Sequence, residues 1–208
     1  MNILVIGGGG REHSICWSVK KSKMCKSLYC IPGNAGISQI AKCEKLDPNK
    51  KMELLEFCKL KKINLVIIGP EQYLENGLSD YLRDKNIKVF GPSKKAARLE
   101  SSKSFAKEFL TKYKINTAKY REFSSLNSAV KFISETNFPI VIKADGLASG
   151  KGVLICKDKN EAEKGINTIM KEKRFGKAGE KIVIEEFLTG FEISYFAFFD
   201  KNSYLPFS

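Results

Sequence analysis

The residues best suited to chemistry lie in the stretch 140–153, which reads I-V-I-K-A-D-G-L-A-S-G-K-G-V. An apolar, β-branched run leads into a lysine, and three glycines and a second lysine follow: Lys143, Gly146, Gly150, Lys151 and Gly152. Glycine permits backbone conformations and close approaches that a Cβ atom would forbid. The N–H groups of such a loop, flanked by two ammonium groups, suit the phosphates of a nucleoside triphosphate. Because a strand pattern resumes at 153–156, we expect a phosphate-binding loop between two strands.

This loop differs from a Walker loop. The Walker motif is G-x-x-x-x-G-K-[ST] and opens a helix, whereas here Gly152 follows Lys151 and no helix pattern begins. Taken alone, the stretch also fits a solvated hairpin that binds nothing.

A second candidate site is the run of four glycines, Gly7–Gly10, which ends the strand predicted for 1–6. A helix is predicted for 11–20, so a phosphate is expected at its N-terminus, as in doubly wound α/β folds. The fingerprint G-x-G-x-x-G fails because its last position holds Glu12, and no carboxylate stands about twenty residues further on. We therefore expect a single phosphate rather than a dinucleotide. His13, the only histidine, is interpreted as structural or substrate-positioning rather than as a base.

Three further strands, predicted for 27–31, 64–68 and 89–90, also end at turn-like loops. These loops are Pro32-Gly33-Asn34-Ala35-Gly36, Gly69-Pro70-Glu71 and Gly91-Pro92-Ser93. Helices are predicted for 48–61 and for 74–85, and the first has an apolar side formed by Met52, Leu55 and Cys58. Each loop alone is an ordinary turn. Four βα units that end at one sheet edge indicate an α/β fold with a doubly wound parallel sheet and ligands at that edge.

From Ser93 the pattern changes. Helices are predicted for 94–99, 103–113, 126–136 and 161–171, the third capped by Ser124. Strands are predicted for 117–123, 140–142, 153–156, 181–185 and 191–199. We place the domain boundary between Gly91 and Lys103, which gives domains 1–100 and 101–208.

Composition indicates a globular protein. The chain has 208 residues, 43% of them hydrophobic, and no apolar run reaches the eighteen residues of a membrane span. No basic segment precedes an apolar run at the N-terminus, so we expect no signal peptide. The six cysteines show no C-x-x-C spacing and there is one histidine. We expect reduced thiols in a cytoplasmic protein, with neither a zinc site nor a disulfide framework.

The formal net charge of +13 raises nucleic acid as a partner. The excess is nearly all lysine and is spread along the chain, with only five arginines. Base readout by arginine or by interleaved aromatic residues therefore has little support. A lysine-rich surface, or a field that attracts phosphorylated substrates, explains the charge better.

In collinear order the chain carries V-I-G-G-G-G-R-E-H, P-G-N-A-G, I-G-P-E, F-G-P-S, L-E-S-S-K, the glycine loop and I-V-I-E-E-F-L-T-G-F-E-I-S. This set closely resembles the phosphoribosylamine–glycine ligase family, the glycinamide ribonucleotide synthetases of purine biosynthesis, which are ATP-grasp enzymes. The resemblance covers the whole chain, although many relatives carry another residue at Gly9. It implies a Rossmann-like N-terminal domain that binds phosphoribosylamine, followed by an α+β ATP-grasp domain.

The resemblance also implies roles for individual residues. The ATP-binding residues would be Lys103, Lys143, Gly146, Ser149, Gly150, Lys151, Gly152, Glu185, Glu186, Phe187, Leu188 and Glu192. Within this set the lysines would contact phosphates, 185–188 would hold adenine mostly through backbone groups, and Glu192 would accept the ribose hydroxyls. The substrate-binding residues would be Gly8, Gly9, Gly10, Arg11, Gly33, Asn34, Ala35, Gly36, Gly69, Pro70 and Glu71.

In the family's reaction ATP phosphorylates the carboxylate of glycine, and the amine of phosphoribosylamine then attacks the acyl phosphate. Such catalysis consists mainly of positioning and charge neutralisation, so no side chain is assigned as nucleophile or base. The expected partners are these small molecules, without nucleic acid or membrane. The sequence does not indicate an oligomeric state.

Family members continue for roughly as long again. Their magnesium- or manganese-binding carboxylate and asparagine come later in the chain. We therefore expect a truncated ATP-grasp domain, no metal ligand before Ser208, weak nucleotide binding at most and no product from these residues alone.

Two alternatives from other classes remain. One is another purine-pathway ATP-grasp ligase or carboxylase, and the other is a non-catalytic nucleotide-binding module. Taken one at a time, these residues also fit purely structural roles without a ligand. Glu185-Glu186 fits an exposed strand end, and Lys103 fits an ordinary position on a helix surface.

Overall fold

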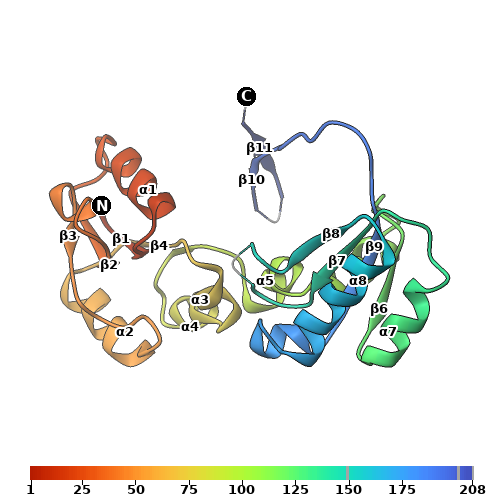
Figure 1. Ribbon diagram of the computed structural model, residues 1–208. Coiled ribbons are helices and arrows are strands. Elements are labelled where there is room, and N and C mark those ends of the chain that lie inside the picture. Colours follow the sequence, from red (N-terminus) through yellow and green to blue (C-terminus); the bar gives the residue numbers. More distant parts are fainter. Residues whose placement is uncertain (149, 201, 208) are drawn as a thin grey trace.

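The first half of the chain forms a five-stranded parallel sheet, in a computed structural model that describes residues 1–148, 150–200 and 202–207. The strand order is β3-β2-β1-β4-β5, and every neighbouring pair is parallel (Figure 1). The strands are β1 (Asn2–Gly7), β2 (Ser27–Pro32), β3 (Lys42–Cys43), β4 (Leu65–Ile68) and β5 (Val89–Phe90). The predicted fold class is thus confirmed. Strand β3 was not predicted, because its two residues, a lysine and a cysteine, form no apolar run, unlike Val89 and Phe90 of β5.

Helices cover both faces of this sheet, as a doubly wound fold requires. They are α1 (Gly10–Lys20), the 3-10 turn η1 (Ile37–Gln39), α2 (Lys51–Leu60), α3 (Glu71–Glu75) and α4 (Leu78–Asp84). Leu4 and Ile6 of β1 pack with α2 and α4, whereas Val5 packs with α1 and η1. Alternate residues of a strand point to opposite faces, so a strand buried on both sides reads as continuously apolar.

Two helix predictions in this half need correction. The helix predicted from Pro48 begins at Lys51, and Met52 is 73% exposed while Leu54 is buried in its place. The helix predicted for 74–85 is two helices, because Gly77 takes a left-handed φ of 73° between them. Such a φ fits glycine and breaks the helical repeat.

The second half forms an antiparallel sheet in the order β6-β9-β7-β8. Its strands are β6 (Tyr120–Phe123), β7 (Ile140–Ala144), β8 (Val153–Cys156) and β9 (Ile182–Glu186). Its helices and turns are α5 (Lys94–Ser101), α6 (Lys103–Lys112), α7 (Leu126–Ile133), α8 (Lys159–Ile166), η2 (Asn167–Lys171) and η3 (Gly176–Gly179). Buried side chains of β7 and β9 pack with α7 and α8 on one face of the sheet.

Smaller corrections concern element ends. Ser125, not Ser124, is the residue before α7, and α7 ends at Ile133 rather than at 136. The strand expected from Thr117 begins at Tyr120. The helix expected for 161–171 begins at Lys159, where Asp158 caps it through the Glu161 N–H, and its end is the π-helical turn η2.

The strand predicted for 191–199 is wrong. Residues 187–196 form no strand, and only β10 (Ala197–Phe199) pairs, with β11 (Tyr204–Pro206), in a hairpin drawn in dark blue in Figure 1. Phe198 of this hairpin meets Phe90 of β5 edge-on, with ring centroids 5.3 Å apart. Within the described residues, no helix is long and apolar enough to cross a membrane.

Three helices end in the same way, with a non-glycine residue in the left-handed region followed by isoleucine. Lys62, Asn86 and Lys114 have φ values of 50°, 62° and 56° after α2, α4 and α6. After α2, the N–H of Ile63 donates to the carbonyl of Cys58 and that of Lys62 to Lys59, which is the Schellman pattern. After α4 and α6, the N–H groups of Ile87 and Ile115 donate in the same way to carbonyls five residues earlier in the chain.

This geometry predicts that Lys62→Gly stabilises the chain. A left-handed φ costs a non-glycine residue about 1–2 kcal/mol, and the extra entropy of glycine in the unfolded chain offsets about half of that. We expect a gain of roughly 0.5–1 kcal/mol in the free energy of unfolding by urea.

The matched control is Lys61→Gly, one position earlier, where φ is −85°. It should lose roughly 0.5–1 kcal/mol, because no strain is relieved there. Equal effects of the two substitutions would contradict the Schellman assignment.

Candidate active site

Five ionisable side chains from four elements line a cavity of about 390 Å³. Glu100 lies on α5, and Lys103 and Lys107 are one helical turn apart on α6. Lys143 precedes the last residue of β7, and Glu185 lies on β9. In the antiparallel register Val141 pairs with Glu185, so Lys143 and Glu185 are diagonal neighbours on one face. The other face carries the apolar residues that pack on α7 and α8, which leaves this face for the charged groups.

One carboxylate oxygen in this cavity is shared by two lysines. Oε2 of Glu185 lies 3.0 Å from Nζ of Lys107 and 3.0 Å from Nζ of Lys143. Lys107 also donates to Oγ1 of Thr117 at 2.7 Å and to the carbonyl of Ala118 at 3.2 Å, so its three donors are used. The group carries a net positive charge, and Lys143 is the lysine with donors to spare for a ligand.

The glycine loop between β7 and β8 is fixed at its base. Asp145 accepts from the N–H of Ser104 at 3.2 Å, from its hydroxyl at 2.6 Å and from the hydroxyl of Ser102 at 3.1 Å. Lys103 donates in return to the carbonyl of Gly146 at 2.6 Å. The N-terminus of α6 and the start of the loop are therefore linked from both sides.

The remaining loop residues are arranged less tightly. Gly150 has a left-handed φ of 74° with open space around its Cα. Gly152 is buried, and a Cβ atom there would come within 2.6 Å of Ala148. Lys151 is exposed. Ser149, which the sequence also assigned to ATP binding, lies outside the described residues.

The predicted adenine segment follows Glu185. Glu186 is tied to the strand beside it, because its carboxylate accepts from the N–H of Lys119 at 2.8 Å. Phe187 is half-exposed, and Leu188 lines the same cavity as the lysines. Glu192 lies in the exposed segment before β10, and no hydrogen bond or ion pair joins it to another described residue.

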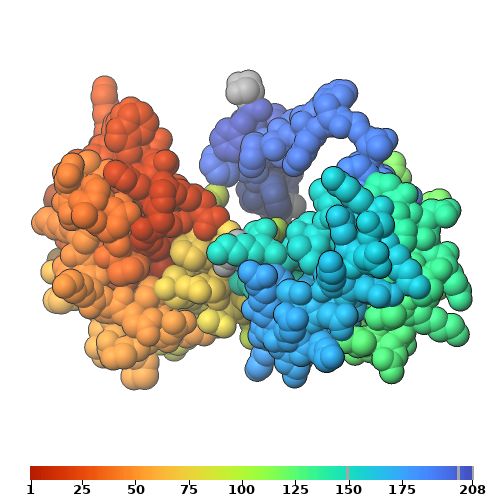
Figure 2. Space-filling view, viewed as in Figure 1, coloured from red at the N-terminus to blue at the C-terminus, as the bar shows by residue number. Residues whose placement is uncertain are grey.

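A second, larger cavity of about 560 Å³ adjoins the glycine loop. It is lined by Glu75, Lys94, Arg98, Asp145, Gly146 and Lys177, among others. Its three cations are exposed at the surface. Figure 2 shows a hollow between the red N-terminal residues and the blue C-terminal segment, bordered below by residues in yellow and teal.

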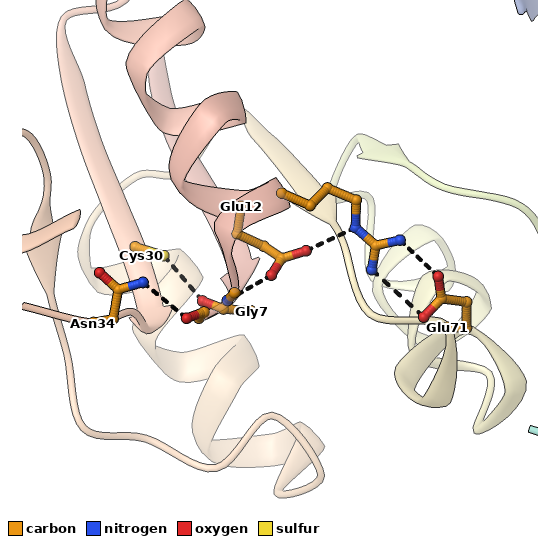
Figure 3. A network of polar contacts seen from close by, with 8 residues as sticks. Gly7, Glu12, Cys30, Asn34 and Glu71 are labelled. Carbon is orange, nitrogen blue, oxygen red and sulfur yellow. Dashed lines mark hydrogen bonds and ion pairs between the residues drawn. The ribbon is translucent and has the colours of Figure 1, made fainter. Parts of the chain in front are cut away.

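The loops at the carboxyl edge of the parallel sheet form a separate site. Asn34 donates from its amide to the carbonyl of Gly8 at 2.8 Å and accepts from the N–H of Ile37 at 2.8 Å. The amide of Asn34 therefore joins the loop after β2 to the loop after β1 (Figure 3), and its oxygen fixes the turn into η1. Gly33, with a φ of 74°, and Gly36, whose Cα faces His13, complete the loop after β2, in which Ala35 is exposed.

An ion-paired network joins the loops that follow β1 and β4 (Figure 3). Arg11 donates from Nη1 to Oε1 of Glu71 at 2.6 Å and from Nε to Oε1 of Glu12 at 3.0 Å. The carboxylate of Glu71 raises the pKa of Arg11, and the guanidinium lowers the pKa of Glu71. Strands β1 and β4 flank the point where the strand order reverses, which is where open α/β sheets bind ligands.

Sequence reasoning assigned no role to three residues that organise these sites: Glu12, Lys107 and Asp145. Lys107 had a detectable signal, since it lies four residues after Lys103 on the predicted helix. Glu12 was noticed only as the residue that breaks a glycine fingerprint. Asp145 was quoted as part of the loop, but its tie to α6 is visible only in the fold.

The shared carboxylate predicts that Lys107→Met is strongly destabilising. The substitution removes a buried cation and leaves Thr117 and Ala118 without a donor, so we expect a loss of roughly 3 kcal/mol in urea unfolding at neutral pH. Lys112→Met, on the exposed last turn of the same helix, is the control and should change stability by less than about 1 kcal/mol. Similar losses for both variants would show that the buried contacts of Lys107 contribute no more to the free energy of unfolding than an exposed lysine does.

Comparisons with known proteins agree over the whole chain. Residues 1–100 match the family model described as "Phosphoribosylglycinamide synthetase, N domain", and residues 101–208 match "Phosphoribosylglycinamide synthetase, ATP-grasp (A) domain". A phosphoribosylamine–glycine ligase of Mesorhizobium japonicum is 47% identical over 207 residues, covering 100% of this chain and 48% of the relative. One from Clostridium acetobutylicum is 43% identical, covering 100% and 50%. The chain thus spans about half the length of the curated relatives it matches.

Solved structures give the same picture. The crystal structure of a phosphoribosylamine–glycine ligase from Thermotoga maritima matches with a TM-score of 0.80 and 35% identity, over 99% of this chain and 49% of that one. A biotin carboxylase–β,γ-ATP complex from Campylobacter jejuni matches with a TM-score of 0.69 at 18% identity, covering 90% of this chain and 45% of that one. The second likeness concerns the fold alone.

Proposed function

Because the chain belongs to the phosphoribosylglycinamide synthetase family, we propose that it forms the phosphoribosylamine- and ATP-binding part of a carboxylate–amine ligase. The reaction joins glycine to 5-phosphoribosylamine and gives glycinamide ribonucleotide, ADP and phosphate. The observation that carries this proposal within the structure is the cavity between α6, β7 and β9, where Lys143 keeps donors free beside an anchored glycine loop.

In this proposal ATP lies in the cavity with its phosphates toward Lys143 and the loop. The ammonium of Lys143 and the N–H groups of 146–152 stabilise charge on the transferred phosphoryl group, in a site that is assembled beforehand. Lys103 is positioned for the same task but now donates to Gly146, so a bound phosphate would compete with that carbonyl. Leu188 offers an apolar wall to adenine.

The chemistry then needs no side-chain nucleophile. The γ-phosphoryl group passes to the carboxylate of glycine, which gains a phosphate leaving group, and the amine of phosphoribosylamine displaces that phosphate to form the amide. The chain's contribution is to hold the reactants in line and to neutralise charge. Phosphoribosylamine occupies the loops after β1, β2 and β4, where Arg11 offers a cation to its phosphate.

Magnesium or manganese bound with ATP would supply further charge neutralisation at the transferred phosphoryl group. Two acidic side chains near the lysines do not fit a metal site, since Asp145 is engaged with Ser102 and Ser104 and Glu185 with two lysines. In the described part of the chain, no three His, Cys, Asp or Glu side chains are grouped to hold a metal. We propose that the ligands belong to other residues of the complete enzyme.

A cytoplasmic location accompanies this proposal. Purine synthesis works on soluble phosphorylated intermediates, and burial raises the pKa of Cys58 and of Cys156 to about 11, so these thiols are protonated at neutral pH. Inert, protonated thiols suit a reducing compartment.

The ATP site predicts a defined effect of Lys143→Ala. Loss of a charge-assisted phosphate contact should weaken ATP binding by roughly 1.5–3 kcal/mol, which is about ten- to a hundredfold in Kd, measured by titration calorimetry. Lys131→Ala, an exposed lysine near the end of α7, is the control and should bind like the parent chain. An unchanged Kd for ATP in Lys143→Ala would show that the phosphates do not bind in this cavity.

The activity itself is tested by incubating the purified protein with ATP, Mg²⁺, glycine and phosphoribosylamine and measuring glycinamide ribonucleotide. Replacing the last two with aminoimidazole ribonucleotide and bicarbonate tests the alternative of a related ATP-grasp carboxylase, whose fold is also similar. Product only in the second assay would favour that alternative. ATP binding without product in either assay is the result expected of these residues alone, and the same result with the complete enzyme would favour a non-catalytic nucleotide-binding module.

A further inference from the structure

A buried carboxylate, that of Glu12, lies between the loops that follow β1 and β4. Glu12, on the first turn of α1, is only 3% exposed. Its Oε2 accepts from the N–H of Gly9 at 2.8 Å, and its Oε1 accepts from Nε of Arg11 at 3.0 Å. A buried carboxylate needs such partners, because an unpaired one is costly to remove from water.

Two glycines, Gly7 and Gly69, approach this carboxylate so closely that a Cβ atom at either position would clash with it, and Gly9 lies near its outer oxygen. A Cβ atom would come within 2.5 Å of Glu12 from Gly7, 2.9 Å from Gly9 and 2.1 Å from Gly69. Gly7 ends β1, Gly9 belongs to the loop after it, and Gly69 follows β4. The glycines of both loops therefore make room for a side chain of the protein itself, not only for a ligand.

Arg11 connects this buried group to the surface. Its Nε is held by Glu12, and its Nη1 reaches Glu71 on the neighbouring loop at 2.6 Å (Figure 3). The side chain of Arg11 is 53% exposed, whereas that of Glu12 is 4% exposed. The guanidinium is thus held from both sides, by the buried Glu12 at Nε and by the exposed Glu71 at its outer nitrogens.

We propose that Glu12 is a positioning residue for the phosphorylated sugar. It fixes the backbone of the loop after β1 through Gly9, fills the space between the two loops, and aims Arg11 at the ligand without touching the ligand itself. This inference rests on the proposed function, since it assumes that a phosphoribosyl compound binds at this sheet edge.

The test is a pair of titrations on the same protein, with ribose 5-phosphate as the probe for the sugar site and ATP as the probe for the other site. Glu12→Gln keeps the shape of the side chain but places an amide where Arg11 and Gly9 need a carboxylate. We expect it to weaken ribose 5-phosphate binding by about tenfold or more while ATP binding changes less than about twofold. The matched control is Glu56→Gln, on the exposed side of α2, which should leave both affinities unchanged.

A second pair of variants separates positioning from simple stability. If Glu12 acts through Arg11, then Arg11→Gln and the double variant Arg11→Gln/Glu12→Gln should lose the same affinity for ribose 5-phosphate, because the two effects are not additive. Glu12→Asp retains the charge and should recover part of the loss, even though its carboxylate is one methylene shorter.

The outcomes are distinct. Parent protein that does not bind ribose 5-phosphate would overturn the proposed sugar site itself. Parent protein that binds, together with Glu12→Gln that binds equally well, would overturn only the role of Glu12. Equal loss of both ligands, additive losses in the double variant, or an unfolded chain for both Glu12 variants would make Glu12 a stability residue and would also overturn the inference.

Discussion

The second half of the molecule depends on one buried carboxylate with two ammonium partners. A single lysine would neutralise Glu185 and leave an ion pair that gains little over its desolvation cost. With two lysines the cluster keeps a positive charge at a fixed place on the cavity wall. Since Lys107 spends its donors on Thr117 and Ala118, the charge of this cluster is presented by Lys143. The positive charge on this wall of the cavity thus follows from how donors are shared.

The alternation of side chains along β7 makes this arrangement compatible with folding. Ile140 and Ile142 face α7 and α8 and supply apolar burial, while Lys143 faces the opposite side. The same strand therefore contributes to the core and to the site, and a shift of register by one residue would exchange the two. The contacts of Asp145 with α6 then set where the glycine loop leaves the sheet.

Periodicity predicted most elements, because strands and amphipathic helices repeat at their own spacing over several residues. It failed where tertiary partners decide the outcome. Alternation over 191–199 indicates a strand only when a neighbouring edge is present, and the structure pairs just Ala197–Phe199. The glycine loops were found by composition, whereas Lys107 and Glu12 are ordinary helix residues in sequence. Lys107 is important because it pairs with Glu185, which lies more than forty residues further along the chain. Glu12 is important because glycines such as Gly69 leave space for its side chain.

The way the helices end suggests how their lengths could change during evolution. After α2, α4 and α6 the same short unit stops the helix: a lysine or asparagine that reverses the backbone, then an isoleucine that folds back. Ile63 is buried and anchors the turn in the core. Such a unit can stop a helix at different lengths, because its two specific residues follow the helix and inside the helix it uses only backbone carbonyls. A helix could therefore gain or lose a whole turn by insertion or deletion upstream and still end correctly.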